Sequence, residues 1–125
     1  MIQEDYVNFE TAKLLNEKGF NGAVSAHYND IGGMIMGTNP ISKNTVKCPT
    51  LQMAMKWLRE NHNFYITSVP NGIGKNVFYM SIYRKYDYGW THISDCLDEE
   101  CKEAEFSSPE EACEAAIKYC LENLI

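Results

Sequence analysis

The sequence contains no apolar run that approaches the ~20 residues a membrane-spanning helix needs. Its first five residues include Glu4 and Asp5 but no basic residue, and no apolar segment follows them as in a secretory signal. These two absences lead us to expect a cytoplasmic protein that does not enter a membrane.

Basic residues are in the minority, with 11 lysines and arginines against 17 aspartates and glutamates, for a net charge of −6 at pH 7. Residues 95–111 hold eight acids and one base, so the rest of the chain sums to +1. Binding to a nucleic-acid backbone requires a basic footprint. We therefore do not expect nucleic acid as a partner.

The five cysteines show no paired pattern, because their number is odd and their spacing is irregular. Cys113 and Cys120 share one face of a predicted helix but lie two turns apart, about 10 Å along the axis, which is too far for a disulfide. We interpret them as small apolar core residues. No cofactor motif is present, so no cofactor is expected.

His92, Cys96 and Cys101 come nearest to a metal cluster. Structural zinc usually takes four ligands, with cysteines paired at Cys-x₂₋₄-Cys spacing. Cys96 and Cys101, with four residues between them, are at the upper limit of that spacing, and no fourth ligand lies nearby in the sequence. We expect buried or loop cysteines rather than a metal site.

Cys48 is the best single candidate for chemistry. It lies just before a predicted helix, and the free amides and dipole of a helix N-terminus favour a thiolate. A nucleophile also needs a base and an oxyanion site, and the sequence does not place any histidine beside Cys48. The favoured interpretation is a small packed residue before the turn at Pro49.

Three helices are predicted from capping residues and apolar spacing. They cover residues 9–18 after Asn8, residues 51–61 after Thr50, and a last segment from Ser108 or Pro109 to about Asn123. Ser108-Pro109-Glu110-Glu111 supplies a serine cap, a proline at the first helical position and a glutamate at the third. The side chains expected to be buried on the last helix are Cys113, Ile117, Cys120 and Leu124.

Short alternating segments predict the strands. Residues 23–28 and 31–36 form one pair around the turn Asn29-Asp30, and residues 38–47 form a loop. Residues 64–69 and 77–84 form a hairpin, followed by a short strand over residues 90–93. The chain is therefore predicted to be a single α+β domain, residues 1–125, in the order α-β-β-α-β-β-β-α. We expect one mostly antiparallel sheet with the helices packed largely on one face.

Two segments carry a resemblance to other proteins. Cys48-Pro49-Thr50, followed by Met55-Lys56-Trp57-Leu58-Arg59-Glu60 and His62, resembles small proteins encoded by gut bacteria and their phages. The opening of the last helix, Ser108-Pro109-Glu110-Glu111-Ala112, and residues 121–125 are similar to the same group, so the resemblance covers about half the chain. The group has no assigned function. The resemblance therefore implies a phage or mobile-element context, but no activity and no catalytic residues.

Strand alternation predicts a functional surface. If the helices cover the face that holds Phe64, Ile66, Phe78, Met80 and Ile82, the tyrosines of the hairpin line the other face. We hypothesise that this face is an interaction surface for a partner protein or a second copy, formed by Tyr65, Tyr79, Tyr83 and Trp90. Tyrosines that simply decorate a solvent-facing sheet are the alternative interpretation.

The sequence thus favours a small, acidic, non-enzymatic protein-interaction module. The alternative function is a small thiol-dependent enzyme or redox protein that uses Cys48.

Overall fold

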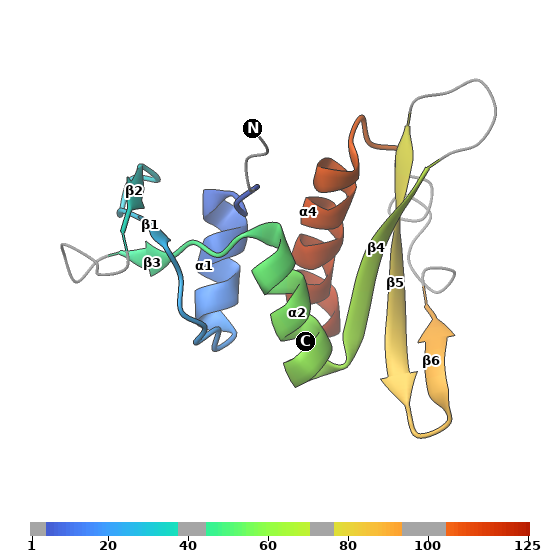
Figure 1. The fold of residues 1–125 in the computed structure, drawn as a ribbon. Helices are drawn as coiled ribbons and strands as arrows, with labels where there is room; N and C mark the ends of the chain where they lie inside the picture. The colour runs from blue at the N-terminus through green and yellow to red at the C-terminus, as the bar shows by residue number, and fades with distance from the viewer. Residues whose placement is uncertain (1–4, 38–44, 71–76, 94–104) are drawn as a thin grey trace.

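A computed structural model describes residues 5–37, 45–70, 77–93 and 105–125 (Figure 1). The helices are α1 (Phe9–Glu17), α2 (Leu51–His62) and α4 (Pro109–Tyr119), which continues as the π-helical turn η2 (Cys120–Leu124). The strands are β1 (Ala26–Tyr28), β2 (Met34–Met36), β3 (Val46–Lys47), β4 (Phe64–Pro70), β5 (Phe78–Tyr86) and β6 (Gly89–His92). The α+β class and the predicted order are confirmed, with the two-residue strand β3 as an addition.

Side-chain caps begin each helix where the sequence predicts. The Asn8 side chain accepts a hydrogen bond from the Thr11 amide, and Thr50 accepts one from the Met53 amide. Ser108 does the same for the Glu111 amide at 3.1 Å. Each bond satisfies an amide that has no partner inside its own helix. Of the helices that the structure describes, none combines the length and apolarity needed to cross a membrane.

The strands divide into two antiparallel sheets, β2-β1-β3 and β4-β5-β6, rather than the one sheet predicted. The first sheet is small, and its strands cover less of the sequence than expected. β3 lies at the end of the segment predicted as a loop. Helix α1 lies between this sheet and the rest of the fold, so the two sets of strands do not meet (Figure 1).

The second sheet packs one face against α2 and α4, and all the described helices lie on that side of it (Figure 1). The centre of the molecule is a set of apolar side chains with almost no exposed surface, which includes Val7, Leu15, Leu58, Ile82, Ile117 and Leu121. Trp57 of α2 meets the ring of Phe20 edge-on at 5.8 Å between centroids. The core therefore joins all three helices to the larger sheet.

The last helix buries most of the residues predicted for it. Cys113, Ile117 and Cys120 are buried, whereas Leu124 is only partly buried at the edge of the core. The π-helical turn η2 contains both Cys120 and Leu124, and Leu121 within it is fully buried. Sequence spacing based on a regular α-helix did not predict this widened turn.

Truncation of Ile117 to alanine should lower the free energy of unfolding by about 2–5 kcal/mol, because the cavity left among the helices and β5 cannot fully collapse. Urea denaturation followed by circular dichroism measures this change. Glu122→Ala on the exposed side of η2 is the control and should change stability by less than about 0.5 kcal/mol. Equal small effects of the two substitutions would show that Ile117 is not a core residue.

Candidate functional site

The sheet β4-β5-β6 has two chemically different faces. The face against α2 and α4 carries the buried residues Phe64, Ile66, Met80 and Ile82. On the other face, Tyr65 stands directly opposite Tyr83, and Tyr83 stands opposite His92. Because side chains alternate along a strand, these rings point away from the helices. We call this side the open face.

Four rings gather on the open face near the β5–β6 hairpin. Tyr65 meets Tyr83 edge-on at 6.2 Å between centroids and Trp90 at 6.0 Å, and Tyr83 lies 4.8 Å from His92. Tyr65 keeps 42% of its surface exposed and Trp90 keeps 46%. We call Tyr65, Tyr83, Trp90 and His92 the aromatic cluster. It contains three of the four residues that the sequence predicted for an interaction surface.

Tyr79 does not belong to this cluster. It lies four residues before Tyr83 on β5, about 13 Å away along the strand. Its hydroxyl donates a hydrogen bond of 3.1 Å to the Glu105 carboxylate. Strand alternation placed Tyr79 on the correct face, but alternation alone does not bring rings together along a strand.

His92, which the sequence offered as a possible metal ligand, belongs to the aromatic cluster. Its Nε2 lies 3.2 Å from the hydroxyl of Ser81, which is a buried residue. A serine–histidine pair suggests nucleophilic catalysis, which also needs free amides that stabilise an oxyanion. Ser81 stands in the middle of β5, opposite Thr67, and its amide is part of the β4–β5 hydrogen-bond ladder. The contact therefore orients the imidazole ring. The pairing of His92 with Tyr83 in the β5–β6 register was the signal that could have placed His92 in the cluster.

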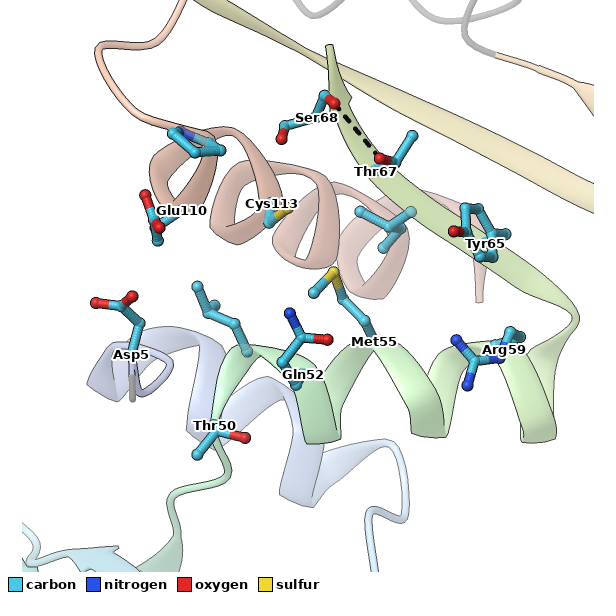
Figure 2. A pocket seen from close by; sticks show the side chains of 13 residues that line it. Asp5, Thr50, Gln52, Met55, Arg59, Tyr65, Thr67, Ser68, Glu110 and Cys113 are labelled. Atoms are coloured by element: carbon cyan, nitrogen blue, oxygen red, sulfur yellow. Dashed lines mark hydrogen bonds between the residues drawn. The ribbon is translucent and has the colours of Figure 1, made fainter. Parts of the chain in front are cut away.

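Positive charge lies at two sides of the cluster. Lys85 stands opposite Trp90 in the β5–β6 ladder and is exposed. Arg59 of α2 and Tyr65 line the same end of one cleft (Figure 2). Arg84 lies over the rings of Phe64 and Tyr86, at 5.6 Å from each centroid.

A cleft of about 500 Å³ lies beside the cluster, between α2, β4 and the start of α4 (Figure 2). Met55 and Cys113 are among its apolar lining, and Arg59 lies at the end next to Tyr65. Asp5 and Glu110 lie at the other end (Figure 2). Sequence reasoning missed this cleft because its walls come from segments far apart in the chain.

The environment of Cys48 opposes the proposed thiolate. Its side chain is fully buried, and the thiol lies 3.5 Å from the Val7 carbonyl, to which it donates a hydrogen bond. Burial raises the pKa of the Cys48 thiol to about 11, which outweighs any favourable effect of the nearby helix N-terminus. The packed-residue interpretation therefore agrees with the geometry, and the thiol-enzyme alternative has no support from it.

The metal candidates cannot be assembled from the described residues. Cys96 and Cys101 lie outside them, and His92 is in contact with Ser81 and Tyr83. Within residues 5–37, 45–70, 77–93 and 105–125, no three histidine, cysteine or acidic side chains converge as metal ligands would. Cys48, Cys113 and Cys120 are free thiols.

Comparison with protein-family models, curated proteins and solved structures found no significant match for this chain. The resemblance to small proteins of gut bacteria and phages therefore stays a prediction. Any function has to be inferred from the chain's own surfaces.

Native Cys48 should resist alkylation by iodoacetamide at pH 7.5. With a pKa of about 11, fewer than about one thiol in 1,000 is ionised there, and burial also excludes the reagent. Peptide mass spectrometry should find Cys48 modified only after the protein is unfolded in denaturant. Cys120, whose pKa is raised to about 12 by burial, provides a matched buried thiol. Faster labelling of native Cys48 than of a free cysteine would restore the thiol-enzyme hypothesis.

Proposed function

We propose that this chain is a non-enzymatic interaction module that binds a partner protein through the aromatic cluster. The observation that carries the proposal is the packing of Tyr65 and Trp90 against each other while both remain over 40% exposed on the open face. Large exposed aromatic side chains gathered at one place are typical of binding surfaces.

The cluster suits binding because its rings are already ordered. Tyr83 is held between Tyr65 and His92, and Ser81 orients the histidine ring. Ring contacts of this kind contribute about 0.5–1.5 kcal/mol each beyond area burial. A partner would therefore meet a surface that loses little rotamer freedom on binding.

The charges beside the cluster indicate the chemistry of the partner. Lys85 and Arg59 flank rings on a chain whose overall charge is −6. A partner with an apolar centre and acidic residues at its edge would match this arrangement and avoid like-charge repulsion. Two copies that met face to face would bring the same cations toward each other, which favours a different protein over self-association.

Single-stranded nucleic acid could also use exposed rings, because bases stack on aromatic side chains. Such binding requires a positively charged path that follows many phosphates. The described residues place Lys85 and Arg59 beside the cluster, on a chain with an acidic total charge. This distribution supports a protein partner.

Replacement of Trp90 by alanine and Tyr65 by serine should weaken partner binding at least thirtyfold, since truncated interface anchors commonly cost 2 kcal/mol or more. A photo-crosslinking residue at position 90 in the native host would capture the partner. Binding of the purified partner would then be measured by calorimetry. Circular dichroism should show the fold unchanged, because both side chains lie outside the core.

Tyr88 is the matched control, because it is an aromatic residue 80% exposed in the same hairpin but outside the cluster. Tyr88→Ser should bind the partner normally, and crosslinking from position 88 should not capture it. Equal affinity of all variants would contradict the proposal. A dimer in sedimentation that is lost only in the Trp90 and Tyr65 variant would replace the partner protein with a second copy of the chain.

A further inference from the structure

The cleft runs along the unpaired edge of β4. β4 is an outer strand of its sheet, hydrogen-bonded to β5 on one side only. Four consecutive residues of β4, from Tyr65 to Ser68, line the cleft. Because successive side chains point to opposite faces of a sheet, a cavity that touches all four must lie along the strand's edge.

The alternation of hydrogen-bonded and non-bonded residue pairs along β4 shows which of its backbone groups face this cleft. The Lys85 amide donates to the Asn63 carbonyl at 2.9 Å, so Asn63 and Lys85 form a bonded pair. Bonded pairs alternate along an antiparallel ladder, which makes Tyr65 and Thr67 bonded positions too. The amides and carbonyls of Ile66 and Ser68 therefore point away from β5.

These edge groups are unused within the described parts of the chain. Neither the Ile66 nor the Ser68 amide donates a hydrogen bond to another described residue. The Ser68 carbonyl has one long contact, 3.4 Å from the neighbouring Thr67 hydroxyl. Unpaired strand edges are templates for another strand, and here the template lies inside a cleft rather than on a flat surface.

We infer that the cleft receives an extended peptide segment of another protein, which adds to β4 as an antiparallel strand through Ile66 and Ser68. This site shares only Tyr65 with the aromatic cluster and does not depend on the function proposed for the cluster. The size of the cleft, about 500 Å³, lies within the range of ligand-binding clefts.

The walls of the cleft specify the order of side chains in the peptide. An antiparallel segment begins near Ser68, where Asp5 and Glu110 favour a basic residue (Figure 2). It ends near Tyr65, where Arg59 favours an acidic residue. An apolar side chain fits between them, against Met55 and Cys113. Because alternate side chains of a strand share one face, the matching ligand has a basic residue, an apolar β-branched residue two positions later and an acidic residue two positions after that.

The test uses the full chain and two synthetic peptides of identical composition. The probe is Gly-Ser-Lys-Thr-Val-Thr-Glu-Ser-Gly, and the control exchanges its lysine and glutamate. Amide hydrogen exchange is followed by NMR. In the free protein, the Ile66 and Ser68 amides should exchange faster than those of Tyr65 and Thr67. Millimolar probe should slow Ile66 and Ser68 at least tenfold, whereas the control peptide should bind at least tenfold more weakly.

Two further comparisons separate strand addition from simple charge attraction. N-methylation of both threonines removes one alternating set of peptide amides, and N-methylation of the valine and the glutamate removes the other. Only one of the two N-methylated peptides should fail to bind, since only one set of peptide amides faces β4. Arg59→Glu combined with Glu110→Lys should reverse the preference between the two peptides. Trp90→Ala should leave probe binding unchanged, which keeps this result independent of the aromatic cluster.

Several outcomes would overturn the inference. Protected Ile66 and Ser68 amides in the free protein would mean that the edge is already covered. Protection that grows with protein concentration in the absence of peptide would assign the edge to a second copy of this chain. Unchanged exchange at millimolar probe, or equal binding of the two peptides, would remove the proposed ligand.

Discussion

Both surfaces of the β4-β5-β6 sheet depend on the register of β4 against β5, which begins with the hydrogen bond from the Lys85 amide to the Asn63 carbonyl. Helix α2 ends at His62, and Asn63 takes the left-handed conformation, with φ of 62°, that turns the chain into β4. Asparagine tolerates this conformation better than most residues. A slip of one residue at this point would exchange the two faces of β4, so that Tyr65 entered the core and Ile66 met solvent.

Packing of the core fixes this register, and the register in turn positions the rings on the open face. A buried aliphatic side chain such as Ile66 or Ile82 contributes about 1.5–3 kcal/mol relative to exposure. An aromatic contact on the open face contributes about 0.5–1.5 kcal/mol. The inner face therefore determines where Tyr65 and Tyr83 stand. The exposed rings are positioned by the fold without being required for it, which allows the open face to serve binding without weakening the core.

Local signals in the sequence predicted the parts of the fold that have local causes. Asn8, Thr50 and Ser108 marked the helix starts because capping acts within one helical turn. The division of the strands into two sheets was not predictable, because it results from helix α1 packing between distant segments.

The candidate sites also contain parts with local causes, which the sequence predicts, and parts that depend on distant segments. Strand alternation found Tyr65 and Tyr83, while the contacts of His92 required the β5–β6 register. The raised pKa of the Cys48 thiol was not predictable from the sequence, because it depends on burial beside Val7, about forty residues earlier in the chain. The cleft depends on α2, β4 and α4 together.

The aromatic cluster and the cleft meet at Tyr65, which lines both. A strand added to β4 would direct the side chains opposite Ile66 and Ser68 toward the cleft, and the residue between them toward the open face. That residue would stand opposite Thr67, next to Tyr65 on the same face. The added strand would therefore enlarge the open face by one column of side chains, beside rings that are already ordered. A partner that carries such a segment could contact both surfaces, and binding at one would raise its effective concentration at the other.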